Sequence, residues 1–207
     1  MQKKQARSAN FSQHKTLKIA AYLTLYKMVT KSEIEEAIRG KDDFVKIDHL
    51  KRMLKNADNI EVKKFILLNL AGTAEQKGLF SEAIKNIVSA SEIVITFREK
   101  IELFMKESEL WIKSGDFNMA DKALQKALAI SGMQERSILQ SRYWEMYRAY
   151  AKAYEDTGKA RKAVAVYERI LSMKQGEKDS LEIKRKLADL YEKVGRIYDA
   201  SAMRRAL

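Results

Sequence analysis

Small and apolar residues recur at fixed distances from four glycines in the last two thirds of the chain. The glycines are Gly78, Gly115, Gly158 and Gly195, at spacings of 37, 43 and 37 residues. An alanine follows each glycine by five residues, at Ala83, Ala120, Ala163 and Ala200. A small residue precedes each glycine by seven positions, at Ala71, Ser108, Ala151 and Ala188. Because four copies agree in phase, the chain contains an internal repeat.

Each repeat predicts two amphipathic helices joined by a tight turn at the glycine. Glycine suits such a turn because it adopts a positive φ without steric cost. The small residues mark the line along which the two helices cross closely, and the larger apolar residues face the next repeat. A single hairpin cannot bury its apolar face, so the repeats must stack. The pattern therefore predicts an all-α fold, with Ser81 and Asn118 as N-caps of the second helices in their repeats.

The N-terminal part of the chain follows the repeat less well. Gly40 precedes Gly78 by 38 residues, but the small positions around it are occupied by larger side chains. Apolar residues recur at helical spacing from Phe44 to Leu54, which predicts a helix near residues 42–56. We expect a basic, disordered tail over 1–10, capping helices or a degenerate hairpin over 11–60, and four repeat hairpins over 61–207.

The residues around the four glycines resemble the tetratricopeptide repeat. That family combines small residues and aromatics around a glycine turn, and aromatics stand at Phe80, Trp111, Phe117, Tyr154 and Tyr191. The resemblance covers about residues 63–207 and implies a right-handed α-α superhelix, a solenoid of antiparallel helix hairpins. The glycine spacing exceeds the family's typical repeat of about 34 residues, which predicts longer helices or loops. Glu107 stands where the family usually has a leucine.

The composition excludes several classes of protein. None of the 207 residues is cysteine, which excludes disulfides, thiolate metal sites and a cysteine nucleophile. The absence of proline and the presence of only 8 glycines argue against a turn-rich all-β fold. No stretch approaches the roughly 20 apolar residues of a membrane span, and residues 19–26 are too short a run for a secretory signal. A chain without cysteine suits a reducing compartment, so we expect a cytoplasmic protein.

The net charge of +12 favours anionic partners, and the excess lies toward the ends of the chain. Residues 1–32 contain seven lysines and arginines and no acidic residue. One interpretation is a basic arm that binds anionic lipid or nucleic acid. A second is an organelle transit segment. We favour a third, a helix that caps the repeat array together with a solvated basic tail.

The sequence offers little that could carry out catalysis. The two histidines, His14 and His49, lie far apart in the sequence and make a weak case for a metal site. Adjacent carboxylates such as Asp42 and Asp43 point about 100° apart on a helix and do not converge on one substrate. No glycine-rich phosphate-binding loop is present. We therefore expect a protein that is not an enzyme and needs neither cofactor nor metal.

One segment is dense in aromatic residues. These residues are Tyr143, Trp144, Tyr147, Tyr150 and Tyr154. The four tyrosines follow one stripe of a helix, which favours core packing over a platform for stacking bases. We expect Tyr143 and Trp144, near the predicted start of this helix, to be the more exposed.

The resemblance also implies a binding groove. In the tetratricopeptide family the first helix of each hairpin lines a concave surface, through positions ten, nine, six, three and two before the glycine. Those positions include Met105 and Ile112 and the polar residues that we expect to bind a partner. The polar candidates are Asn69, Lys106, Arg148, Lys152, Arg185 and Lys186. An asparagine can bond both polar groups of an extended peptide backbone, and an arginine can bind a carboxylate through two hydrogen bonds. Alternatively, these charges only keep an open surface soluble.

The first functional hypothesis is a non-enzymatic module or scaffold for protein–protein interaction. Its partner would be an extended peptide or a helix, with acidic residues to match the groove. Two alternatives stay open, a helical repeat that binds nucleic acid through its basic ends and an adaptor that binds a membrane surface through residues 1–32. The sequence stops at Leu207, where the last predicted helix is barely complete, so we expect either a truncated sequence or self-association through this end.

Overall fold

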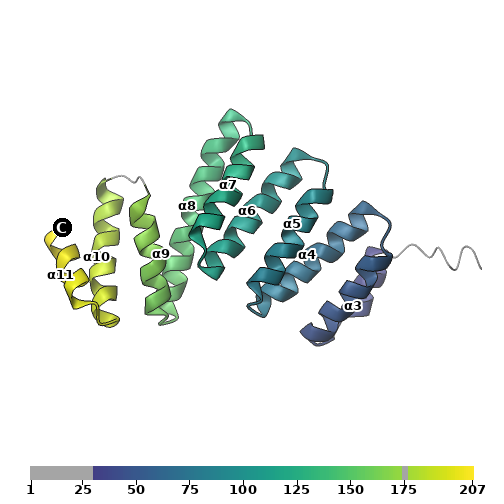
Figure 1. Cartoon of the computed structure of the whole chain (residues 1–207), viewed down its shortest axis with the longest axis horizontal. Helices are drawn as coiled ribbons and strands as arrows, with labels where there is room; N and C mark the ends of the chain where they lie inside the picture. Colours follow the sequence, from purple (N-terminus) through teal and green to yellow (C-terminus); the bar gives the residue numbers. More distant parts are fainter. Residues whose placement is uncertain (1–29, 174–176) are drawn as a thin grey trace, which may run out of the picture. The chain divides into compact units, whose positions relative to one another are not determined.

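The computed structural model describes residues 30–173 and 177–207, and every regular element in these ranges is an α-helix (Figure 1). The helices in the order of the chain are α2 (Lys31–Ile38), α3 (Asp43–Asn56), α4 (Ile60–Gln76), α5 (Phe80–Ile93), α6 (Phe97–Ser114), α7 (Phe117–Ile130), α8 (Met133–Asp156), α9 (Ala160–Ser172), α10 (Glu177–Lys193) and α11 (Ile197–Arg205). The predicted all-α class is therefore confirmed for these residues.

The chain divides into two compact units, Met1–Ile66 and Leu67–Leu207, so the boundary lies within α4. In the first unit, α2 packs against α3. Thr30 and Glu33 form a reciprocal cap at the start of α2, and the Asp42 side chain accepts a hydrogen bond from the Phe44 N–H at the start of α3. The helix predicted near 42–56 is confirmed. The tail predicted over 1–10 and any helix before residue 30 lie outside the described residues.

The turns predicted at glycine are confirmed. The four repeat glycines, Gly78, Gly115, Gly158 and Gly195, have a positive φ, and so does Gly40. At Gly115 the φ of 90° ends α6, and the Gly115 N–H donates to the carbonyl oxygens of Trp111 and Ile112, at 3.0 and 3.1 Å. Asp116 N–H also donates to the Trp111 oxygen, so the turn satisfies carbonyls that the helix end leaves without partners. Each of these glycines thus ends one helix and allows the next to turn back.

The small residues of the repeat are buried. All eight belong to the core, namely Ala71, Ala83, Ser108, Ala120, Ala151, Ala163, Ala188 and Ala200. The Ser108 hydroxyl donates to the carbonyl oxygen of Ala120 at 3.0 Å, which ties α6 to α7 at their crossing. The repeat phase inferred from the glycines therefore places small side chains in the close-packed core.

The predicted N-caps Ser81 and Asn118 are wrong. The helix α5 begins after Leu79, which makes no side-chain cap, and α7 begins after Asp116. Asp116 accepts a hydrogen bond from the Met119 N–H at 3.1 Å. Both helices start earlier than expected, because only one residue separates the turn glycine from the first helical turn.

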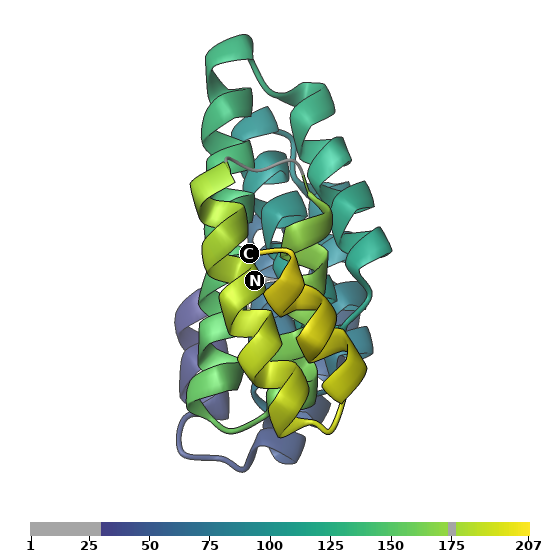
Figure 2. The same cartoon turned by 90° about the vertical axis from the view of Figure 1, so that its left-hand side faces the viewer.

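The long glycine spacing of 43 residues has its origin in α8. This helix has 24 residues, whereas α6, its counterpart in the preceding repeat, has 18. The difference of six equals the difference between the spacings of 43 and 37. Figure 2 shows α8 and α10 in one layer of the second unit and α7 and α11 in the other. The added turns therefore lengthen a helix of the first layer and leave the repeat phase intact.

Two tyrosines of the aromatic stripe lie in the core of the second unit. Tyr147 is fully buried, and Tyr143 is 4% exposed. Their rings meet edge to face with centroids 5.0 Å apart, and Tyr143 donates a hydrogen bond to Asp121, which also pairs with Arg169. Burial and the bond to Asp121 raise the pKa of Tyr143 far above its ordinary value. The core interpretation of the stripe is confirmed for these two residues.

The predicted exposure of Tyr143 is wrong. The helix α8 begins at Met133, ten residues before Tyr143, so this residue lies in the middle of the helix rather than at its start. Trp144 is partly buried and packs against the same core. The sequence pattern did not predict that the six additional residues of this repeat lengthen α8.

Candidate functional site

The polar face of α4, α6 and α8 in the second unit is held together by ion pairs between helices. Lys106 on α6 lies 2.9 Å from a carboxylate oxygen of Glu75 on α4 and 3.0 Å from one of Glu109 on its own helix. Lys113 bonds the same two carboxylates, and its contact with Glu109 measures 2.8 Å. From α8, Tyr150 donates to Glu109 at 2.5 Å. These five side chains form one network, which we call the inter-repeat network.

The network shifts the ionisation of its members. Burial by itself raises the pKa of Glu109, but hydrogen bonds from Lys113, Tyr150 and Lys106 outweigh it and lower the pKa to about 2. Burial by itself lowers the pKa of Lys113, yet its bonds to Glu109 and Glu75 raise it above the ordinary value. Lys106, which the sequence placed in a binding groove, is therefore engaged inside the molecule. A partner would have to break these bonds to use it.

Two apolar residues assigned to the groove are buried instead. Met105 is 2% exposed and Ile112 is 1% exposed. Both belong to the core cluster that α6 shares with α8. The expectation that they line an open surface is wrong, because the first helices of successive repeats pack against each other and cover this side of α6.

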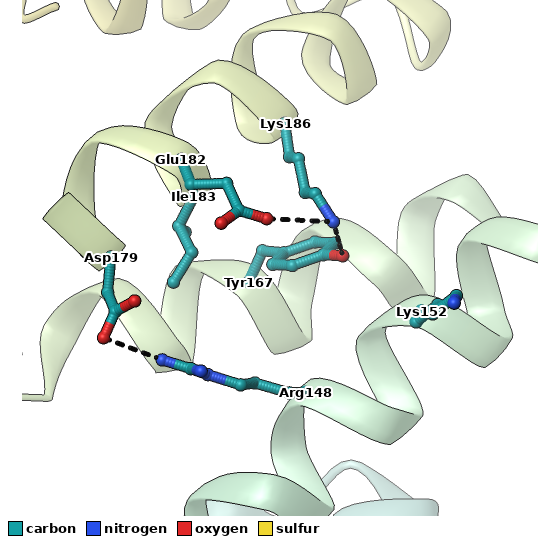
Figure 3. Close-up of a pocket in the computed structure, with 7 residues that line it drawn as sticks. All are labelled: Arg148, Lys152, Tyr167, Asp179, Glu182, Ile183 and Lys186. Carbon is teal, nitrogen blue, oxygen red and sulfur yellow. Dashed lines mark hydrogen bonds and ion pairs between the residues drawn. The ribbon is translucent and has the colours of Figure 1, made fainter.

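The structure does form a pocket between α8, α9 and α10. Its volume is about 170 Å³, and it is lined by Arg148, Lys152, Tyr167, Asp179, Glu182, Ile183 and Lys186 (Figure 3). We call it the α8–α10 pocket. Three of the six residues singled out from the sequence, Arg148, Lys152 and Lys186, meet here. Ile183 and the ring of Tyr167 supply apolar surface between them, and both residues are largely buried.

Ion pairs hold most of the charges around this pocket. Arg148 on α8 pairs with Asp179 on α10 at 3.0 Å, and Lys186 pairs with Glu182 at 3.6 Å (Figure 3). Lys186 also lies 5.6 Å from the centroid of the Tyr167 ring. The Tyr167 hydroxyl in turn donates to Glu155 at 3.0 Å, and burial together with this bond raises its pKa. The two walls of the pocket are thus fixed by contacts between helices.

Lys152 differs from the other cations of the pocket. It is exposed, and no ion pair to it is found among the residues that the structure describes. Figure 3 shows it on α8, apart from the bonded pairs. An incoming carboxylate can therefore bind Lys152 without displacing an internal partner.

The other two candidates lie outside this pocket. Asn69 is half-buried on α4, where its backbone carbonyl oxygen accepts a hydrogen bond from the Thr73 hydroxyl. Arg185 is exposed on α10, but it follows Lys184 and precedes Lys186 on a helix, so its side chain leaves in a different direction. The structure therefore gathers three of the predicted residues and separates Asn69, Lys106 and Arg185 from them.

Sequence reasoning missed four residues of the pocket. These are Tyr167, Asp179, Glu182 and Ile183. The groove positions were counted back from each glycine on first helices alone, so Tyr167 on the second helix α9 was not considered. Glu182 and Ile183 lie four and three residues before Lys186, and this spacing places them on the same side of α10.

The described residues show no grouping for metal chemistry and no membrane span. In 30–173 and 177–207, no three His, Asp or Glu side chains gather closely enough to hold a metal ion. His49 contacts Lys41, with 3.0 Å between the ring nitrogen and the ammonium nitrogen. Over the same residues, no helix combines the length and the apolar character needed to cross a bilayer.

Comparison with known proteins does not assign the chain to a family. No protein-family model matches the chain, and no curated protein matches it. The class of protein therefore rests on the fold. Over the described residues, this is an all-helical protein whose consecutive helices pack in a repeat-like way.

Proposed function

We propose that the chain is a tetratricopeptide-like repeat protein, with hairpins that wind into a right-handed superhelix, and that it acts as a non-enzymatic protein-interaction module. Its binding site for a partner is the α8–α10 pocket. The observation that carries this proposal is the convergence of Arg148, Lys152 and Lys186 around the apolar surface of Ile183. The five glycine turns and the buried small residues support the repeat assignment.

The size of the pocket favours a peptide side chain as its occupant. Pockets for small molecules and cofactors usually measure about 300–1,000 Å³. A volume of about 170 Å³ suits one apolar side chain of a longer segment. Such an anchor would lie against Ile183, while an acidic residue beside it reaches Lys152. In peptide recognition, a buried apolar anchor usually supplies most of the affinity, and the charged residues around it supply selectivity.

Selection from a library of random peptides tests this proposal. The full-length protein is used as bait, beside the variant Lys152→Glu and the matched control Lys85→Glu, which makes the same charge change at an exposed residue of α5. We expect the wild type and the control to enrich peptides with an acidic residue next to an apolar one. Lys152→Glu should lose this enrichment while its circular dichroism spectrum stays unchanged.

Two results would speak against the proposal. If Lys152→Glu and wild type enrich the same peptides, the pocket is not the binding site. If the control loses enrichment as much as Lys152→Glu does, the net charge of the protein, rather than the pocket, determines binding.

A further inference from the structure

A second cavity lies in the second unit, at the turn between α8 and α9. It is open, has a volume of about 450 Å³, and is lined by residues of this turn and of the end of α10. The lining residues are Gly158, Lys159, Ala160, Arg161, Lys162, Lys193 and Val194. Four of them are cations and none is acidic. We call this feature the basic cavity.

The four cations have no carboxylate partner among the residues that the structure describes. All four are exposed, and the one interaction found for their charged groups is that of Lys162, which lies 5.7 Å from the centroid of the Tyr154 ring. At the next turn the situation differs, because Arg196 bonds both Glu168 and Asp199, at 2.7 and 2.6 Å. Glu168 and Asp199 are thus engaged with a cation that does not line the cavity. Four like charges around one space repel each other, and an anion that enters would relieve that repulsion.

An exposed aromatic residue lies just past the turn between α10 and α11, which Figure 1 shows on the same edge of the second unit as the turn between α8 and α9. Tyr198 is 92% exposed in the first turn of α11, five residues after Lys193 and just past the turn at Gly195. Tyrosine is intermediate between buried and exposed residue types, because its ring is apolar and its hydroxyl is polar. A ring this open presents a flat face to a ligand.

We propose that this edge binds single-stranded nucleic acid. The phosphates would lie against Lys159, Arg161, Lys162 and Lys193, and a base would stack on Tyr198. Cationic grooves combined with aromatic stacking are the general means by which proteins hold single strands without reading their sequence. An acidic peptide would use the cations equally well but has no use for the ring, and this difference makes the two partners distinguishable. The activity is separate from the α8–α10 pocket and from the peptide that we propose for it.

The test measures binding of a fluorescent oligothymidylate of about 15 nucleotides to the full-length protein by fluorescence anisotropy. The triple variant Lys159→Glu/Arg161→Glu/Lys162→Glu reverses three of the four charges of the cavity. The control Lys55→Glu/Lys85→Glu/Lys122→Glu makes the same change in net charge at exposed residues of α3, α5 and α7. Neither triple variant changes the basic residues 1–32, so any binding by these residues contributes equally to both.

We expect the cavity variant to bind at least about tenfold more weakly than the control at moderate salt. The slope of log affinity against log salt should fall by about two, at roughly 0.7 for each lost phosphate contact. Tyr198→Ala should weaken binding by about 5- to 150-fold with the salt slope unchanged, and Tyr198→Phe should bind like the wild type. The tyrosine variants alter one exposed side chain, so they test the site even if the triple variant fails to fold.

Other outcomes would overturn the proposal. Equal loss of affinity in the two triple variants would show that diffuse charge, and not the cavity, attracts the strand. If Tyr198→Ala binds like the wild type and polyglutamate displaces the oligonucleotide at equal charge concentration, the cavity accepts any acidic chain. Tighter binding to phosphatidylserine vesicles than to the oligonucleotide would assign the edge to a membrane surface.

Discussion

The buried carboxylate of Glu107 gives the sharpest test of the packing between α6 and α7. Glu107 is 2% exposed, and its two oxygens accept hydrogen bonds from Lys126, at 2.9 and 3.1 Å. The side chain of Lys126 is 46% exposed, so one partner reaches water and the other does not. Replacing Lys126 by methionine keeps a side chain of similar length and removes the charge that neutralises Glu107.

The expected cost follows from the burial of the remaining charge. Removing one partner of a buried ion pair usually costs about 3–5 kcal/mol. Because Lys126 is half exposed, we expect Lys126→Met to lower the free energy of unfolding by about 2–3 kcal/mol. In a chain of this size that corresponds to a fall in the melting midpoint of about 5–10 °C. Thermal melting followed by circular dichroism at pH 7 measures it.

Two further variants make this prediction decisive. Lys122→Met changes an exposed lysine of the same helix and should leave the melting midpoint within about 1 °C of wild type. Adding Glu107→Leu to Lys126→Met should recover most of the loss, since an apolar pair can replace a buried ion pair without cost. If Lys126→Met melts like Lys122→Met, or if the double variant is as unstable as the single one, Glu107 is not a buried charge held by Lys126.

Three further predictions concern the inter-repeat network, the helix crossings and the turns. Because the pKa of Glu109 is lowered to about 2, the stabilising effect of its carboxylate is complete above pH 4.5 and is lost as the pH falls toward 2. Glu109→Gln should therefore lower the free energy of unfolding at pH 7. Urea unfolding should show that the difference in stability between wild type and Glu109→Gln is smaller at pH 3 than at pH 7. Ala163→Glu introduces a charge where the wild-type side chain is fully buried, so it should cost several kcal/mol, and an unchanged melting midpoint would contradict the repeat phase. Gly115→Ala should cost about 1 kcal/mol because the φ is 90°, whereas Gly72→Ala, within α4, should stabilise by a similar amount; thermal melts that shift in the same direction for both would refute the turn geometry.

The helices of the second unit could be predicted from the sequence because the same pattern of glycine and small residues occurs in four copies. A glycine with positive φ and a small residue at a crossing leave few alternatives, so the turn at Gly115 and the burial of Ala163 could be located from spacing alone. The length of α8 was harder to place, because six extra residues fit equally well into a loop or a helix. This is why Tyr143 was expected near a helix start and is found in the core.

The candidate site was predicted only in part, since it depends on which side chains meet across helices. Lys106 and Glu75 are 31 residues apart, and no local pattern indicates that they bond. Met105 and Ile112 obeyed the positional rule for a groove yet are covered by neighbouring helices. Lys152, by contrast, lines the α8–α10 pocket, and its position relative to Gly158 fixes its face of α8.

The inter-repeat network and the α8–α10 pocket differ in how far their charges are paired. In the first, Glu75, Lys106, Glu109 and Lys113 satisfy one another, so this surface stabilises the packing of α4, α6 and α8. In the second, Lys152 has no ion pair among the described residues and borders an apolar hollow. A partner gains more from the second surface, because no internal bond has to be broken first.

The most direct test of the proposed function is site-specific photo-crosslinking in the cells from which the protein comes. A photoreactive amino acid is placed at Lys152, and in a separate variant at Lys85 on α5. A partner segment in the α8–α10 pocket predicts a discrete crosslinked protein from position 152 that is absent from position 85. No crosslinked product at position 152, or the same products from both positions, would contradict a binding site in this pocket.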